Sequence, residues 1–471
     1  MLSASPFRRA GYRRRVHPFR RLLAATGAVV LLTTLLAACE GEDSGPDAET
    51  VRAAEPSGLA AAPAGDVVAA SRFLLESASA VVLVPAEEPQ AALDRALDLG
   101  VPALPDTEAG RAEAKRLGAR ILAADDAAGA GADPIERAVR PTIAATGKPS
   151  RELLAMADLG DADLVRIATD PRRHAPSAKL LRRDPDGALL SLGADDYAVR
   201  VVRADAQTVG GGWFATRGKH LVAMYGHPSG PALGVLGEQG TKASVARVRK
   251  LVRKYRKAAP DEHFVPAFEI ITTVAAADKG PHGDYSARTE VSDLEPLVDA
   301  AEKAGIVVIL DLQPGRSSFL TQAKEYESLL RRPHVGLALD PEWRLGPKGK
   351  PLQRIGHVGA KEVNRTSAWL AALTRKHALP QKVFVLHQFQ TQMIRNRDRV
   401  RTDHPELSTV IHVDGQGSPG AKFGTWGVIR EDAPANVGWG WKNFVDEDEP
   451  MLDVAQTWRR VRPHPELITY Q

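Results

Sequence analysis

The sequence predicts an α/β protein with two domains, a small parallel-sheet domain followed by a (β/α)8-barrel-like domain. Short runs of β-branched residues alternate with segments of helical periodicity along most of the 471 residues, which is typical of parallel strands joined by crossover helices. In the second half of the chain, nearly every such run ends in an ionisable or hydrogen-bonding side chain. A single cysteine leaves no pair for a disulfide, so each domain must be stabilised by its apolar core.

The first domain is expected over residues 67–210. A β-α-β-α-β series is expected within it, with strands over 80–84, 101–104 and 118–122 and helices over 90–99 and 108–117. Each helix in such a series returns the chain to the same end of the sheet, so the strands pair in parallel. The sequence therefore predicts a small parallel sheet.

Two phrases in this series, 99–104 (LGVPAL) and 116–120 (RLGAR), resemble one unit of the cell wall-binding repeat 2 family of Gram-positive surface proteins, as does the VVLV strand before them. The family carries tandem copies with an Asn-Phe-Ala-Asp-Ala-like phrase at the helix start. This chain has 88–92 (EPQAA) there and no clear further copy. The resemblance implies an inherited α/β scaffold, and a single unit does not predict the array with which the family binds polymers.

The second domain is expected over residues 211–471, after three glycines that mark the boundary. Seven strands are expected, over 221–225, 264–271, 306–311, 335–340, 382–387, 407–414 and 436–442, with helices between most of them. This series predicts a (β/α)8-barrel-like domain whose eighth strand is missing or irregular. An open doubly wound sheet is the alternative.

The strand ends supply the candidate site residues, because the carboxyl ends of barrel strands meet around one pocket. The candidate catalytic acids are Asp340, Glu342, Glu269, Asp311 and Asp414. The candidate substrate-binding residues are Tyr225, His227, Gln313, His387, Gln388, His412, Trp439, Trp441 and Lys442. A single acid or histidine at a strand end is often a cap or a structural hydrogen-bond partner, but the set together predicts a ligand pocket.

Glycoside hydrolysis is the first chemistry that such a pocket could perform, since it needs two carboxyl groups across a sugar ring. Asp340-Pro341-Glu342 at the fourth strand end resembles the paired acids of barrel glycosidases and muramidases. Trp343, Trp439 and Trp441 would serve as flat platforms for sugars. The late strand, 438–441 (GWGW), carries no acid where many such enzymes have their nucleophile.

A divalent metal site is the second option, because histidines and carboxylates are suitable ligands. The candidate ligands are His227, His387, His412, Asp311, Asp340 and Asp414. No HExxH motif supports this option, which leaves the metal content unknown, and no other cofactor is predicted. The third option is a non-catalytic binding or scaffold protein.

The N-terminus predicts export and a lipid anchor. Residues 1–38 contain seven arginines and no acid, and they include the short apolar stretch 22–36. The phrase Leu36-Ala37-Ala38-Cys39 resembles the lipobox of bacterial lipoproteins, in which the cysteine receives a diacylglycerol. An ordinary signal peptide or signal anchor is the alternative, and the export route, Sec or twin-arginine, stays open.

Residues 39–66, rich in acid, Ala, Pro and Gly, are expected to be a disordered tether.

The charge distribution argues against a nucleic-acid partner. The whole chain carries a net charge of +4, so the part that follows the arginine-rich leader is net negative. The basic stretch 242–257 that remains has apolar residues at helical spacing and predicts an amphipathic helix with a solvated basic face.

Longer phrases of the second domain resemble a group of uncharacterised exported lipoproteins, mostly from high-G+C Gram-positive bacteria. These phrases are 226–240 (GHPSGPALGVLGEQG), 310–320 (LDLQPGRSSFL), 338–345 (ALDPEWRL) and 412–420 (HVDGQGSPG). The resemblance implies a location and no activity. We therefore expect a lipoprotein on the extracellular face of the cell membrane whose barrel-like domain binds or hydrolyses an envelope glycan, with a non-catalytic scaffold and a metal-dependent hydrolase as alternatives.

Overall fold

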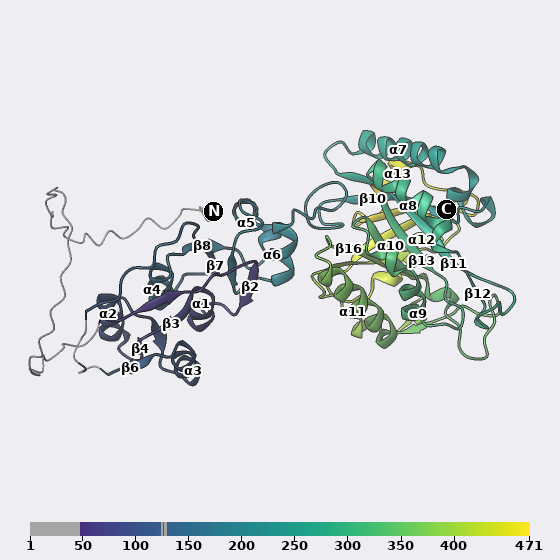
Figure 1. Ribbon diagram of the computed structural model, residues 1–471. Helices are drawn as coiled ribbons and strands as arrows, with labels where there is room; N and C mark the ends of the chain where they lie inside the picture. The colour runs from purple at the N-terminus through teal and green to yellow at the C-terminus, as the bar shows by residue number, and fades with distance from the viewer. Residues whose placement is uncertain (1–47, 124–125, 127–129) are drawn as a thin grey trace, which may run out of the picture. The chain divides into compact units, whose positions relative to one another are not determined.

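The computed structural model describes residues 48–123, 126 and 130–471. These residues form two compact units (Figure 1). Within the described residues, unit 1 comprises 48–180 and 184–196, and unit 2 comprises 181–183 and 197–471. The predicted signal over 1–38 and its Cys39 lie outside the described residues.

Unit 1 contains two small parallel sheets and one antiparallel pair. The first sheet has the order β2 (Leu59–Ala62), β9 (Leu189–Leu192), β7 (Thr142–Thr146) and β8 (Asp163–Ile167). The second has β4 (Ala80–Val84) between β5 (Ala103–Pro105) and β6 (Arg120–Leu122). The antiparallel pair joins β1 (Val51–Ala53) to β3 (Leu75–Ala78).

The helices of unit 1 cover these sheets with apolar faces. They are α1 (Val67–Leu74), α2 (Pro89–Leu99), α3 (Glu108–Leu117), α4 (Arg151–Leu159) and, extending by one residue into unit 2, α5 (Ala175–Leu181). Helix α3 begins where the Thr107 side chain accepts a hydrogen bond from the backbone of Gly110, and it ends at Gly118 with φ of 71°. Leu74, Leu153 and Met156 are completely buried in the shared core.

The prediction of a disordered tether is wrong from Val51 onward. Strand β1 pairs with β3, and β2 pairs in parallel with β9, with Leu59 opposite Leu189. A strand at the edge of a sheet gains its hydrogen bonds from the neighbouring backbone, so it does not need the large side chains whose absence suggested disorder. The partly buried Ala60 and Ala62 pack against the core of unit 1.

Unit 2 contains a closed barrel of eight parallel strands. In order around the barrel they are β10 (His220–Gly226), β11 (Phe264–Ala275), β13 (Val307–Leu312), β14 (Val335–Leu339), β16 (Lys382–His387), β18 (Leu407–Val413), β19 (Gly438–Asn443) and β20 (Leu467–Tyr470). Strand β20 pairs with β10 and closes the barrel. The predicted barrel is therefore confirmed, and the open sheet is excluded. The eighth strand is present at the C-terminus, which corrects the expectation that it is missing or irregular.

Helices surround the barrel on most sides (Figure 1). They are α7 (Thr241–Ala258), α8 (Val291–Ala304), α9 (Phe319–Glu325), α10 (Glu327–Leu330), α11 (Ala360–Lys376), α12 (Pro419–Arg430) and α13 (Val454–Arg460). Strand β16 is followed by two 3-10 turns and the short strand β17 (Ile394–Arg395), so no α-helix connects β16 to β18. Asn396, which is left-handed with φ of 54°, interrupts a helical path at this point.

The core of unit 2 has two layers because alternate strand residues face opposite sides. Side chains such as Leu221, Val265 and Ile309 fill the barrel interior. Their strand neighbours, such as Val222 and Val308, pack against the surrounding helices. The interior is therefore apolar in its lower layers, which leaves only the carboxyl ends of the strands for polar side chains.

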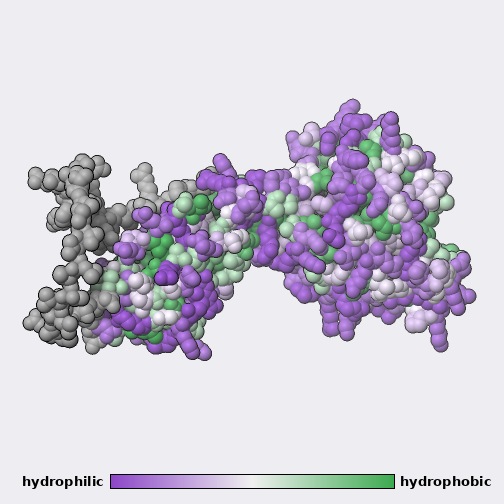
Figure 2. All heavy atoms as spheres, viewed as in Figure 1, coloured by the Kyte–Doolittle hydropathy of each residue, from purple (hydrophilic) through white to green (hydrophobic). Residues whose placement is uncertain are grey.

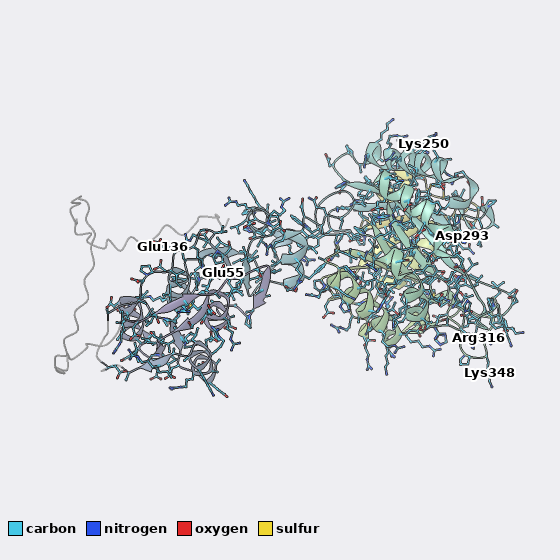
Figure 3. All side chains as sticks on the ribbon, in the orientation of Figure 1. Glu55, Glu136, Lys250, Asp293, Arg316 and Lys348 are labelled. Atoms are coloured by element: carbon cyan, nitrogen blue, oxygen red, sulfur yellow. The ribbon has the colours of Figure 1, made fainter. Side chains whose placement is uncertain are left out.

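The basic helix α7 has the amphipathic character that its sequence predicts. Val248, Val252 and Tyr255 face the core, whereas Lys250 is exposed and extends from the outer side of the helix (Figure 3). The face of unit 2 seen in Figure 2 is covered mainly by hydrophilic residues. Within the described ranges, the structure contains no helix that is both long enough and apolar enough to cross a membrane.

Closure by β20 predicts that this strand contributes strongly to stability. Ile468 is completely buried and lies between Val222 of β10 and Trp441 of β19. We expect Ile468→Ala to reduce the free energy of unfolding by about 2–5 kcal/mol, because it leaves a cavity where the barrel closes. Urea denaturation followed by circular dichroism measures this loss. Ile355→Ala, at a position 36% exposed in the same unit, is the control, and equal losses in the two variants would contradict the assignment.

Candidate active site

At the carboxyl end of each barrel strand, one buried polar side chain lies above the apolar interior. This polar ring consists of Tyr225, Glu269, Asp311, Asp340, His387, His412, Lys442 and Thr469. All eight are at most 4% exposed. Sequence reasoning identified every member except Thr469, which was missed together with its strand. The strands bring the predicted acids and two of the predicted histidines into one place.

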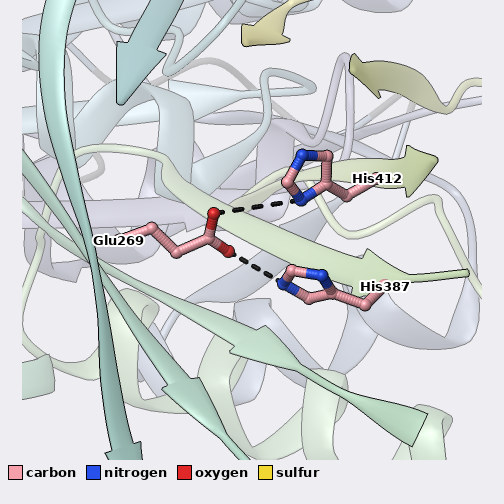
Figure 4. A group of neighbouring side chains, drawn as sticks. All are labelled: Glu269, His387 and His412. Atoms are coloured by element: carbon pink, nitrogen blue, oxygen red, sulfur yellow. Dashed lines mark hydrogen bonds and ion pairs between the residues drawn. The ribbon is translucent and has the colours of Figure 1, made fainter. Parts of the chain in front are cut away.

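His387 contacts carboxylates from three other strand ends, and Figure 4 shows its contact with Glu269. Its Nδ1 is 2.9 Å from Asp414 Oδ2, and its Nε2 is 2.9 Å from Glu269 Oε1 and 3.8 Å from Asp311 Oδ1. Burial alone would lower the pKa of His387, but the carboxylates of Glu269, Asp311 and Asp414 raise it well above its ordinary value. The imidazole therefore donates through both nitrogens and carries a positive charge.

His412 is the neighbour of His387 on the adjacent strand, with ring centroids 4.7 Å apart. Its Nε2 is 3.0 Å from the hydroxyl of Thr469, and its Nδ1 is 3.8 Å from Glu269 Oε2. Burial and the positive charge of His387 lower the pKa of His412 well below its ordinary value. His412 is therefore neutral.

Two acids of the ring are protonated more readily than ordinary carboxylates. Asp311 accepts a hydrogen bond of 2.9 Å from the Tyr225 hydroxyl, and burial raises the pKa of Asp311 to about 6. Burial also raises the pKa of Asp340 well above its usual range. The Asp340 carboxylate accepts a hydrogen bond of 3.1 Å from the backbone N–H of Glu342 and so caps the short turn Pro341–Trp343.

Glu342 and Asp414 lie one step further toward the open end of the barrel, beyond Asp340 and His412. Glu342 is half-buried, and burial followed by the charge of Asp414 raises the pKa of Glu342 to about 7. Burial would raise the pKa of Asp414 as well, but its hydrogen bond with His387 lowers it below the ordinary value. The surroundings therefore keep Glu342 partly protonated near neutral pH, while Asp414 is ionised.

The acids of the ring outnumber its cations. Lys442 lies 3.7 Å from the centroid of the Tyr225 ring and, with His387, supplies the positive charge of the ring. Several buried atoms of the site lack a hydrogen-bond partner within the described residues. They are Glu269 Oε2, Asp311 Oδ1, His412 Nδ1 and Asp414 Oδ1. Unpaired buried polar atoms are costly, so their concentration here favours a ligand-binding site.

The two tryptophans of β19 do not face the ring, which corrects their assignment as sugar platforms. Alternation along β19 directs Gly440 and Lys442 inward, while Trp439 and Trp441 pack outward against Trp426 of α12. Trp441 is 1% exposed, and its Nε1 donates to Asn443 Oδ1 over 3.0 Å.

Three other predicted binding residues have structural partners. His227 lies in the loop after β10, where its nitrogens contact the hydroxyls of Ser229 and Thr289 at 2.7 and 2.9 Å. The Gln313 side chain accepts from the backbone of Ala275. The Gln388 side chain donates to the backbone carbonyls of Gln390 and Thr391 and accepts from Arg397. These contacts shape the loops around the barrel mouth.

The arrangement supports two kinds of chemistry. Glu342 and Asp414 have the opposed ionisation that acid–base catalysis requires. Deeper in the barrel, Glu269, His387 and His412 each offer one ligand atom, and these atoms lie within 4.8 Å of one another.

The chain matches no protein-family model, and no curated protein is significantly similar to it.

The outward packing of Trp441 predicts that it serves stability. We expect Trp441→Ala to lower the free energy of unfolding by about 3–5 kcal/mol, because a large buried ring is lost from the cluster beneath α12. Chemical denaturation measures this loss, with Leu352→Ala at an 87% exposed position as the control. A variant that unfolds like the wild type but no longer binds ligand would contradict the assignment.

Proposed function

We propose that this protein is a lipid-anchored surface protein whose barrel binds an envelope glycan and hydrolyses a glycosidic bond. The observation that carries the proposal is the pair formed by Glu342 and Asp414 at the barrel mouth. Glycoside hydrolysis needs a protonated carboxyl group for the leaving oxygen and an ionised one to attack or to activate water. Their raised and lowered pKa values support these two roles.

The position of Glu342 supports its role as the acid. Glu342 follows β14, the fourth strand of the barrel. The paired acids of barrel glycosidases and muramidases, which 340–342 resembles, also follow the fourth strand. The hydrogen bond from the backbone of Glu342 to Asp340 holds the turn that carries it. Of the three tryptophans that the sequence suggests as sugar platforms, Trp343, which is half-buried and next to Glu342 in the chain, is the one that does not pack against α12. It is therefore the candidate to contact a sugar ring.

The ionised partner in this proposal is Asp414. Its charge has the largest effect on Glu342 after burial. One oxygen of Asp414 is held by His387, while Oδ1 has no hydrogen-bond partner among the described residues, which leaves it to pair with a substrate or a water molecule. This role places an acid directly after β18, so no acid is needed on β19, where the sequence lacks one.

Replacement of the acid tests catalysis directly. We expect Glu342→Gln to reduce the release of sugars from cell-wall glycans by at least about 100-fold, because the amide cannot donate the proton, while the midpoint of thermal unfolding stays close to the wild-type value. Wild-type turnover should fall as the pH rises above about 7, since Glu342 then loses its proton. The reducing ends released measure both effects.

Glu431→Gln, at an exposed glutamate of unit 2, is the matched control and should keep full turnover. A wild-type protein that binds cell-wall glycans and releases no product would refute hydrolysis and favour a binding or scaffold role. Equal turnover in Glu342→Gln and the wild type would remove Glu342 from the mechanism.

The location rests on Cys39, the single cysteine of the chain. Because its sulfur is the one thiol that can receive a diacylglycerol, we expect Cys39→Ser to leave the membrane fraction or to persist as an uncleaved precursor. Fractionation of cells followed by immunoblotting measures this outcome. A variant that fractionates and migrates like the wild type would show that the lipid anchor is not formed at Cys39.

A further inference from the structure

The interior of the barrel holds a carboxylate oxygen and an imidazole nitrogen that face each other without a hydrogen bond between them. Glu269 Oε2 and His412 Nδ1 lie 3.8 Å apart, and neither has a hydrogen-bond partner among the described residues. Both side chains are completely buried, so water does not satisfy them from the surface. Thr469 is the partner of the other nitrogen of His412. If that nitrogen donates to the Thr469 hydroxyl, the lone pair of Nδ1 points toward the carboxylate.

We propose that Glu269, His387 and His412 bind one divalent transition-metal ion, with Zn²⁺ as the best fit to their donor atoms. Zn²⁺ accepts imidazole nitrogen and carboxylate oxygen at about 2.0–2.2 Å. The three ligand atoms already lie within 4.8 Å of one another, so small side-chain movements would close them around an ion. Mg²⁺ and Ca²⁺ fit less well, because they prefer shells made of oxygen.

A fourth ligand is within reach. Asp311 Oδ1 is 3.8 Å from His387 Nε2 and is buried with no hydrogen-bond partner in the described part of the chain, while its other oxygen is held by Tyr225. A single ion would therefore satisfy three unpaired atoms, those of Glu269, His412 and Asp311. A proton on one of them would satisfy fewer.

The contacts behind the ligands are those that orient metal-binding histidines. Such a histidine usually donates its second N–H to a carboxylate or another acceptor, which fixes the ring. His387 Nδ1 bonds to Asp414, and His412 Nε2 bonds to Thr469, so the remaining nitrogen of each ring is directed at Glu269. Metal binding would release the Nε2 proton of His387 to solvent, while Nδ1 keeps its proton and its hydrogen bond to Asp414.

This site lies deeper in the barrel than Glu342 and does not depend on the glycan proposal. His412 lies in β18, two residues before Asp414, which follows that strand, so it lies one interior layer below the mouth. Metal binding can be measured in the absence of any glycan. The two proposals can therefore fail separately.

Titration of the full chain with Zn²⁺ tests the inference. Protein purified with chelator and then dialysed should bind one Zn²⁺ per chain in isothermal titration calorimetry, and a Co²⁺-loaded sample should show the visible absorption of nitrogen and oxygen ligands. Glu269→Gln and His412→Gln should each weaken binding by at least about 10-fold. His227→Ala, which removes a strand-end histidine outside the ring, should bind like the wild type.

A variant with a smaller effect on folding is needed if Glu269→Gln or His412→Gln unfolds the barrel. Thr469→Val retains the shape of the side chain and removes the hydroxyl that holds His412, so we expect binding about 10–100-fold weaker. Wild-type protein that takes up no Zn²⁺ overturns the proposal. Wild-type affinity in Thr469→Val, or in a folded Glu269→Gln protein, overturns it as well.

Glu342→Gln separates this proposal from the proposed function. It should bind Zn²⁺ with the wild-type affinity while it loses turnover. Stoichiometric Zn²⁺ binding without glycan hydrolysis would refute the function and support the metal site. Glycan hydrolysis by a wild-type chain that binds no Zn²⁺ would do the reverse.

Discussion

The contact of His387 with carboxylates from several strands is the interaction on which the interior of the barrel depends. Glu269, Asp311 and Asp414 come from separate strand ends, and without a positive charge between them their mutual repulsion would oppose closure of the barrel. Removing one partner of a buried charged group typically costs about 3–5 kcal/mol, because the others are left uncompensated. The polar ring is thus a stability cost that the apolar layers below it must offset, which is typical of a functional site.

The barrel makes this cost tolerable by dividing its interior into layers. Alternation along each strand places residues such as Val265 and Ala267 below Glu269, and Val383 and Val385 below His387. The apolar layers hold the strands together, and the ring residues are at most 4% exposed, so bulk water is excluded from them. The same exclusion of water strengthens every electrostatic interaction within it, so the ionisation of each acid is set mainly by its neighbours.

The sequence was sufficient to predict the barrel and most of the ring, because both depend on local pattern. Seven strands were recognised from their β-branched runs, and their polar ends followed from the rule that carboxyl ends meet. Strand β20 was missed because it has only four residues and follows a segment rich in proline. The run over 198–202 is rich in β-branched residues, but it lies in helix α6 (Asp196–Arg203), where Tyr197, Val201 and other apolar residues are buried. Such an outcome depends on tertiary packing, which β propensity does not report.

The site residues that were misassigned show what pattern cannot supply. Trp441 and Lys442 are adjacent in sequence, yet one packs against a helix and the other lies in the ring, because a shift of one residue along a strand reverses the face. The register of β19 against β18, with Gly440 opposite His412, decides between them. It also explains why glycine occupies the inward position there. A Cβ on Gly440 would lie 2.6 Å from the His412 ring, so this glycine leaves the imidazole room to direct its free nitrogen toward Glu269.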